Sequence, residues 1–321
     1  MSNRLHIDGT EEFGFILLNR FLYSFYMYQN TVKRICDLYH YASVLNLKGY
    51  AAHFCYLRLK SFDTLVKVVL NHKDYLSACC ILRMLGDSVA VFNLIYMERD
   101  IELRWLRHAL YVLEGCEQNL KVLPIDGVNE GTMPAEELAT QKEGVKYNVE
   151  HRKRLISKAN QLIDESPLKK QNKEAFEKIV KDKNWKFKEF KTYKKIKDNQ
   201  YSWHELYEKI DMCECFDLLS FISQYVHSLS MSNIVMDMNA QNIDGIVGEA
   251  LGLIKQLHRY TLTFYTEEQK YILEGLKDPE MRDKILACYD PKHRPAVTKW
   301  DQDVNNKIIS LRISGTFDIM L

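Results

Sequence analysis

Apolar residues recur at every third or fourth position along most of this chain, which is the period of an α-helix that buries one face. In the stretch TVKRICDLYHYASVL, for example, Ile35, Leu38, Ala42 and Leu45 share a face. The pattern as a whole predicts an all-α protein built as a multi-helix bundle. The other clear helical stretches are residues 62–70, 101–120, 202–212, 214–230 and 240–265.

Four segments depart from this simple period. Residues 74–98 are apolar nearly all round, which is typical of a central, buried helix. Residues 115–134 contain three glycines and two prolines, so we expect a loop. Thr266 and Gln269 have the spacing of a capping box and predict the start of a helix. Residues 308–313 could form a short strand, but a single strand has no partner in this chain.

Composition excludes several common classes of protein. Hydrophobic residues make up 46% of the chain and charged residues 27%, as in ordinary globular proteins. Glycine and proline are scarce, which disfavours all-β and Rossmann-type folds, and the common phosphate-loop and esterase motifs are absent. The eight cysteines and the absence of an export signal or a long uninterrupted apolar run predict a cytoplasmic protein without a membrane span.

Positive charge is concentrated in the middle of the chain. Between residues 140 and 200 there are 18 Lys or Arg against 9 Asp or Glu, although the formal net charge of the whole chain is +1. This contrast predicts a basic helical insertion in a helical core. We therefore expect an N-terminal half of the core (1–120), the basic insertion (135–200), a C-terminal half of the core (201–275) and a tail that packs on the core (276–321).

The basic insertion interleaves lysines with four aromatic residues, Trp185, Phe187, Phe190 and Tyr193. Such a pattern can bind nucleic acid, with cations on phosphates and rings that stack on bases. It is also typical of a solvated segment whose rings anchor it to a core. The candidate nucleic-acid surface consists of Lys153, Arg154, Lys186, Lys188, Lys194 and Lys195.

Arg83 and Asp87 stand four residues apart on the most apolar predicted helix, so they share a face. A buried charge is almost always paired, which favours a mutual salt bridge that fixes helix packing. The alternative is a polar patch at the floor of a pocket, where Arg83 would hold an anion.

A second polar group lies on the helix predicted at 214–230, where Ser223 and His227 share a face. A single histidine on such a face is usually a hydrogen-bonded core or edge residue. Alternatively, His227 could act as a general acid or base at neutral pH. In that interpretation Asp87, Ser223 and Tyr225 would be binding residues around it.

Two further patterns in the sequence are weaker indications of a site. Arg34 and His40 have the spacing R-x5-H found in HEPN ribonucleases, but about one such match is expected by chance in this composition. Cys213 and Cys215 lie near His204 without a second ligand pair at zinc spacing, so we expect neither a metal nor another cofactor.

Taken together, the motifs ILRMLGD (81–87), WHELYEKI (203–210) and LSFISQYVHS (219–228) resemble an uncharacterised family of bacterial all-helical proteins, some of them distantly similar to HEPN proteins. The resemblance covers about residues 30–260. That family often has a tyrosine four residues before the serine, where this chain has Leu219. The resemblance implies a helical fold with a polar cluster of Arg83, Asp87, Ser223 and His227, and it supplies no activity.

Two functions follow from these patterns. In the first, the protein is a binding or regulatory module, linked to stress or phage defence, that binds RNA or another anionic ligand through the basic insertion. In the second, it is a metal-independent, HEPN-like ribonuclease with His227 as acid and base and Arg83 as the phosphate clamp. A homodimer is one option for its assembly.

Overall fold

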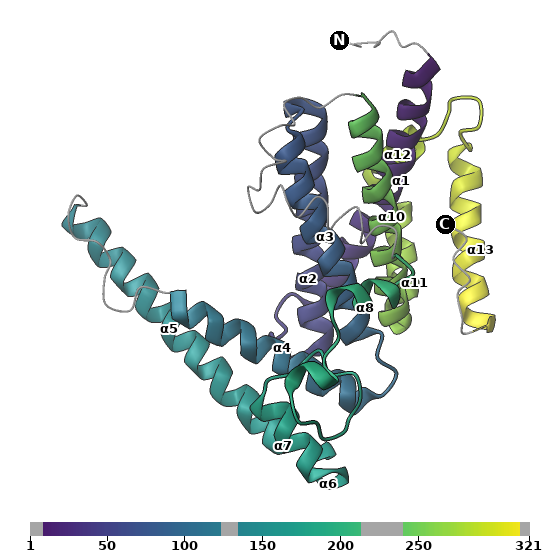
Figure 1. Ribbon diagram of the computed structural model, residues 1–321. Helices are drawn as coiled ribbons and strands as arrows, with labels where there is room; N and C mark the ends of the chain where they lie inside the picture. Colours follow the sequence, from purple (N-terminus) through teal and green to yellow (C-terminus); the bar gives the residue numbers. More distant parts are fainter. Residues whose placement is uncertain (1–8, 123–133, 213–239, 315–321) are drawn as a thin grey trace. The chain divides into compact units, whose positions relative to one another are not determined.

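The computed structural model describes residues 9–122, 134–212 and 240–314, which form twelve α-helices and no strand (Figure 1). The all-α multi-helix bundle expected from the sequence is therefore confirmed. Contacts within the chain divide it into two compact units. By their described residues, unit 1 comprises 9–42, 48–97, 203–212 and 240–314, and unit 2 comprises 43–47, 98–122 and 134–202.

Unit 1 is a bundle in which α10 packs against both α1 and α3. Phe21 and Tyr28 of α1 place their rings near Phe62 of α2, which brings the second helix into the same core. The helices of unit 1 are α1 (Gly9–Tyr39), α2 (Leu47–Lys67), α3 (Tyr75–Tyr96), α8 (Trp203–Glu208), α10 (Ala240–Phe264), α11 (Gln269–Glu274), α12 (Pro279–Ala287) and α13 (Val297–Ser314), with a π-helical turn η1 (Val68–His72) and 3-10 turns η4 (Thr266–Glu268) and η5 (Gly275–Lys277).

The apolar helix α3 is the buried helix that its sequence predicts. The carboxylate of Asp74 accepts a hydrogen bond from the Ser77 backbone N–H at 3.0 Å and so caps the helix N-terminus. By length and composition α3 could also cross a membrane, but 67% of its most apolar window is buried inside the protein. The core helix of a globular protein meets the same two criteria, and the packing of α3 against α10 fits that interpretation.

The C-terminal part of unit 1 forms a second apolar cluster around α11, α12 and α13. Trp300, Val304 and Ile308 are buried at a spacing of four residues, which is a helical period. Residues 308–313, which could also have formed a short strand, are helical, because α13 continues through them. The expected capping box is also absent: the Thr266 hydroxyl donates to the Thr263 carbonyl instead, and a 3-10 turn precedes α11.

Unit 2 contains two long helices, α4 (Ile101–Val122) and α5 (Ala135–Asp164), which pack side by side and run in opposite directions (Figure 1). Two shorter helices follow, α6 (Leu168–Gln171) and α7 (Lys173–Lys181), and then the 3-10 turn η2 (Ile196–Asn199). The contacts place α4 with the lysine-rich segment, whereas the sequence grouped it with the N-terminal half of the core. The stretch expected as a loop from residue 115 is helical as far as Val122.

A buried polar cluster lies inside unit 1 between α1 and α10. The His258 Nε2 atom lies 2.8 Å from the Thr31 hydroxyl oxygen, and the Thr31 hydroxyl itself donates to the Met27 carbonyl at 3.2 Å. Nε2 is therefore the protonated donor of a neutral imidazole. Burial lowers the pKa of His258 to about 4, since no solvent is available to stabilise the imidazolium.

This lowered pKa predicts an acid-labile fold. The His258 imidazole takes up a proton near pH 6.5 in the unfolded chain but only near pH 4 in the folded chain. Its contribution to stability is therefore fully present above pH 6.5 and falls as the pH drops toward 4. We expect the titration of His258 to lower the unfolding free energy by about 2 kcal/mol between pH 8 and pH 5. Urea unfolding of the wild type and of His258→Gln at both pH values measures this loss.

The glutamine variant keeps a donor toward Thr31 but has no proton to gain. Its unfolding free energy should therefore fall less than that of the wild type between pH 8 and pH 5. Equal losses in the two proteins would show that His258 does not titrate differently in the folded and unfolded chains.

Candidate nucleic-acid interface

The most distinctive surface feature of unit 2 is an irregular segment of 19 residues, 184–202, which we call the lysine loop. It contains six lysines against two acidic residues. A segment this long without an α-helix or a strand is unusual inside a compact domain and is commonly functional. The conformation of this loop is fixed by an extensive set of hydrogen bonds.

Asn199 pairs the two halves of the lysine loop. Its side-chain amide donates to the Glu189 carbonyl at 2.8 Å, and its side-chain oxygen accepts from the Glu189 N–H at 3.0 Å. The Asn199 carbonyl accepts from the Lys188 N–H at 3.1 Å and from the Asn184 side chain at 3.0 Å. Asn199 is fully buried, so these bonds are shielded from competing water.

The buried Arg107 of α4 holds the start of the lysine loop. One guanidinium nitrogen donates to the Trp185 carbonyl at 3.1 Å and to the Phe187 carbonyl at 2.8 Å, and the group lies 3.8 Å from the centroid of the Phe187 ring. Glu98 lies 3.6 Å from the second nitrogen. Burial lowers the pKa of Arg107 to about 10, and the nearby Glu98 carboxylate opposes that shift, so the group stays charged at neutral pH.

Three side-chain contacts with α4 fix the same end of the loop. The indole N–H of Trp185 donates to the Glu114 carboxylate at 2.5 Å, and the Trp185 ring lies edge-on to Tyr111. Lys183 forms an ion pair with Glu117. The base of the lysine loop is thus attached to α4 by charged, aromatic and backbone contacts.

These contacts leave several lysines exposed at the surface. Lys194, Lys195 and Lys197 are exposed and make no ion pair with any residue that the structure describes. Lys186 and Lys188 are partly exposed, with their ammonium groups 5.6 and 5.8 Å from the ring centroids of Trp185 and Tyr201.

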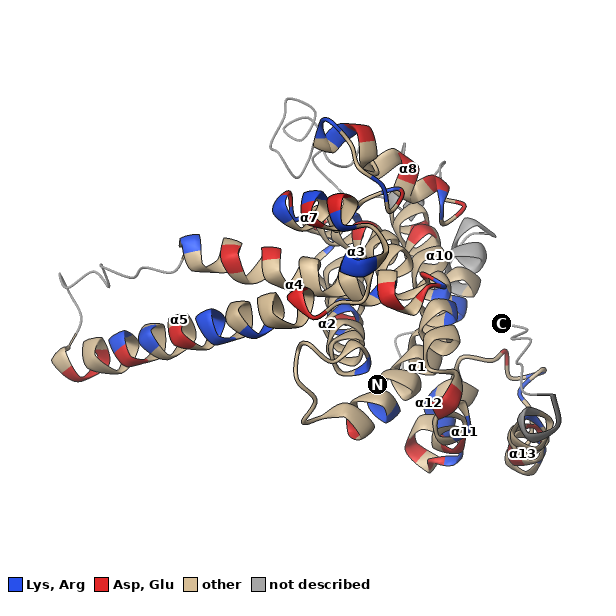
Figure 2. Cartoon of the chain, turned by 90° about the horizontal axis from the view of Figure 1, so that it is seen from below, with Lys and Arg blue, Asp and Glu red and all other residues tan. Residues whose placement is uncertain are grey.

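The other two candidate residues, Lys153 and Arg154, are exposed on α5. Figure 2 shows basic residues along this helix with acidic ones between them. All six residues of the candidate surface therefore belong to unit 2 and are at least partly exposed. The two aromatic residues of the loop nearest α4, Trp185 and Phe187, are 8% and 0% exposed. These rings anchor the loop and are not available for stacking on bases.

In unit 1, Arg83 and Asp87 form the salt bridge that their spacing indicates. The two guanidinium-to-carboxylate distances are 3.1 and 3.3 Å, so the contact is bidentate. The Tyr207 hydroxyl of α8 donates to the same carboxylate at 3.0 Å, and its ring faces Arg83 at 5.8 Å. The pair thus joins α3 to α8, which supports its structural interpretation.

Ser223 and His227 of the predicted polar cluster lie outside the described residues, as does the predicted binding residue Tyr225. The ribonuclease hypothesis stays a prediction. Cys213 and Cys215 also lie outside. Within the described ranges, no group of three or more His, Cys, Asp or Glu side chains could hold a metal ion.

The R-x5-H spacing does not correspond to an open site. The Arg34 guanidinium lies 4.9 Å from the centroid of the Tyr271 ring. Its side chain also passes Gly275 so closely that a Cβ atom built there would lie 2.4 Å from the Arg34 Nε. Arg34 therefore packs α1 against the turn η5, while His40 lies exposed against Tyr41.

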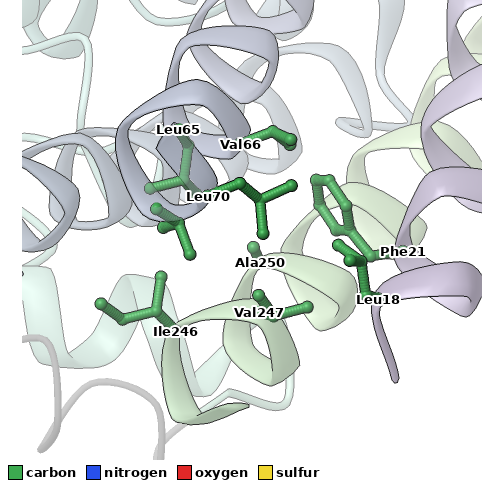
Figure 3. Close-up of a pocket in the computed structure, with 9 residues that line it drawn as sticks. Leu18, Phe21, Leu65, Val66, Leu70, Ile246, Val247 and Ala250 are labelled. Atoms are coloured by element: carbon green, nitrogen blue, oxygen red, sulfur yellow. The ribbon is translucent and has the colours of Figure 1, made fainter. Parts of the chain in front are cut away.

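Concave features also occur among the described residues of unit 1. A cavity of about 10 Å³ is lined by apolar side chains of α1, α2, η1 and α10 that point toward one another (Figure 3), and it is too small for a ligand. A groove of about 350 Å³ lies between α1, α2 and α12. Its Lys284 is paired with Glu280 at 2.7 Å, and carboxylates of Asp37 and Asp278 line the same groove, so it is poorly suited to an anion.

Sequence reasoning missed the residues that build the lysine loop, above all Arg107 and Asn199. A signal for Arg107 was present, because it occupies an apolar position between Leu103 and Leu110 in the helical period. An arginine at such a position needs buried acceptors, and the loop carbonyls supply them.

Comparison with protein-family models, with curated proteins and with solved structures found no match to this chain. The resemblance to a bacterial helical family stays a prediction, as do the cytoplasmic location, the link to defence and the homodimer.

The paired halves of the lysine loop predict resistance to trypsin despite its six lysines. In Asn199→Ala, the Glu189 N–H and carbonyl lose their partners, which should cost about 1–3 kcal/mol of local stability. We expect trypsin to cut the variant within residues 186–197 much faster than the wild type, as mass spectrometry of the fragments would show.

Asn148→Ala is the matched control, because Asn148 is exposed on α5 and makes one local bond to the Gly144 carbonyl. It should be cut at the wild-type rate. Rapid cutting of the wild-type loop would mean that its backbone is not held as described.

Proposed function

We propose that the protein is a nucleic-acid-binding module that holds RNA on the lysine-rich face of unit 2. The observation that carries this proposal is the lysine loop, a hydrogen-bonded segment that presents Lys194, Lys195 and Lys197 without ion-pair partners among the described residues. Ammonium groups of this kind bind phosphates and release counterions from the nucleic acid.

The rigidity of the loop strengthens this proposal. Ordering a flexible lysine-rich segment on binding would cost conformational entropy for each residue that is fixed. Here the folding of unit 2 has already fixed the backbone through Asn199 and Arg107. The charges are therefore preorganised for a polyanion.

The salt bridge of Arg83 also favours a binding module over a ribonuclease. A phosphate clamp requires a guanidinium that can leave its partner for the substrate. Arg83 is held by both oxygens of Asp87, which in turn accepts a hydrogen bond from Tyr207. The lysine loop offers cations without such competition.

The test is RNA binding at a series of salt concentrations. For wild-type protein we expect affinity to fall steeply as salt rises, with a slope of about −0.7 per phosphate on a single strand. The double variant Lys194→Glu, Lys195→Glu should bind at least tenfold more weakly at low salt. Its slope should be shallower by about 1.4, because two phosphate contacts are lost. Fluorescence anisotropy with a labelled oligonucleotide measures both quantities.

The matched control is the double reversal Lys277→Glu, Lys292→Glu, which changes the net charge equally on exposed residues of unit 1. It should leave the affinity within about twofold. Equal weakening by both double variants would show that binding follows net charge and not the lysine loop.

A further inference from the structure

An exposed pair of stacked rings lies on α5 in the same unit as the lysine loop. Tyr147 is 64% exposed, and its ring is nearly parallel to that of His151, with 6° between the ring planes and 6.1 Å between centroids. Among the described residues, neither side chain forms a hydrogen bond or an ion pair. Most of the Tyr147 side chain is therefore accessible to solvent.

The position of this pair on the helix is informative. At 100° per residue, Tyr147, His151, Arg154 and Lys158 fall within about 60° of one another around the α5 axis. The buried residues of α5 lie on roughly the opposite side. They are Val149, Ala159 and Ile163.

Arg154 and Lys158 are exposed on this stripe, one and two further turns after the His151 ring. Neither forms an ion pair with a described residue. Glu143 and Glu150 flank the stripe, so it is not a purely electrostatic surface. Rings next to cations are the arrangement by which proteins hold unpaired bases and their phosphates.

Gly144 adds an independent observation. Side chains on a helix lean toward its N-terminus, so Tyr147 leans over the turn that contains Gly144. A Cβ atom at Gly144 would meet nothing within 4 Å. A glycine inside a helix costs about 1 kcal/mol relative to alanine, and no neighbour in the structure requires it here. The missing side chain leaves open space at the helix turn that precedes Tyr147.

From this geometry we infer that Tyr147, stacked on His151, is a binding site for an unpaired nucleobase, with Arg154 and Lys158 on the adjoining phosphates. The inference rests on the proposed function and adds its substrate class: a single strand, in preference to a duplex. In the lysine loop Trp185 and Phe187 are buried, and Tyr193 is only partly exposed and donates to the Lys178 carbonyl. In this proposal α5 therefore provides the stacking and the lysine loop provides charge.

The experiment compares four labelled probes: a single-stranded RNA of about 12 nucleotides, a DNA single strand of the same sequence, an RNA duplex of the same length, and inorganic polyphosphate. We expect Tyr147→Ala to weaken single-strand binding about tenfold or more, since one stacked base is lost. Tyr147→Phe keeps the ring and should bind within about twofold of the wild type. Duplex and polyphosphate affinities should not change in either variant.

A second variant separates binding from folding. Gly144→Leu should raise the stability of α5, because glycine is replaced by a good helix former in open space. It should nevertheless weaken single-strand binding by fivefold or more, because the new side chain would occupy the space beside Tyr147. Tyr41→Ala, at a 96% exposed tyrosine in unit 1, is the control and should bind as the wild type does.

The outcomes are distinguishable. If the wild type binds RNA and Lys194→Glu, Lys195→Glu weakens it while Tyr147→Ala does not, the stacking site is wrong and the proposed function stands. If wild-type protein binds no nucleic acid, both fail. Equal losses for RNA and DNA single strands would support base stacking without recognition of the ribose, and a loss for RNA alone would add a contact to the 2′-hydroxyl.

Discussion

The organisation of unit 2 depends on one buried cation, the Arg107 guanidinium. Removing a charge from water is costly unless it gains partners inside the protein. Arg107 gains two loop carbonyls, the Phe187 ring and the Glu98 carboxylate. None of these partners lies on α4, the helix that carries Arg107. The arginine can therefore be satisfied only when the lysine loop adopts its folded path, which links helix packing to loop conformation.

This constraint separates two roles that the sequence presents as one pattern. The basic segment alternates lysines with aromatic rings, but the folded loop turns Trp185 and Phe187 inward and leaves the lysines outside. Phe190 and Tyr193 of the loop are only partly exposed, and Tyr193 is bonded to Lys178. Tyr147 on α5 has the greater exposure and a parallel neighbouring ring, which suit it to stacking on a base. In this account unit 2 binds phosphates with its loop and a base with its helix, while unit 1 is a helical bundle.

The sequence predicted those features of the fold that depend on residues close together in the chain. The helical period, the burial of α3 and the Arg83–Asp87 salt bridge all follow from residues within a few turns of one another. The lysine loop could not be predicted, because Arg107 and its acceptors are separated by 78 and 80 residues. Residues 308–313 are helical, because the four-residue spacing of Trp300, Val304 and Ile308 buries one face of α13. Ser223 and His227 of the predicted cluster lie outside the described residues.

The central claim is that Arg107 fixes the lysine loop, and amide hydrogen exchange tests it most directly. The Lys188 N–H is bonded to the Asn199 carbonyl and the Tyr201 N–H to the Lys186 carbonyl, at 3.1 and 2.9 Å. In the wild type both amides should exchange slowly. In Arg107→Met, which keeps the bulk of the side chain and removes its donors, both should exchange much faster while α10 of unit 1 keeps its protection. Fast exchange at these amides in the wild type, or unchanged protection in the variant, would contradict the account.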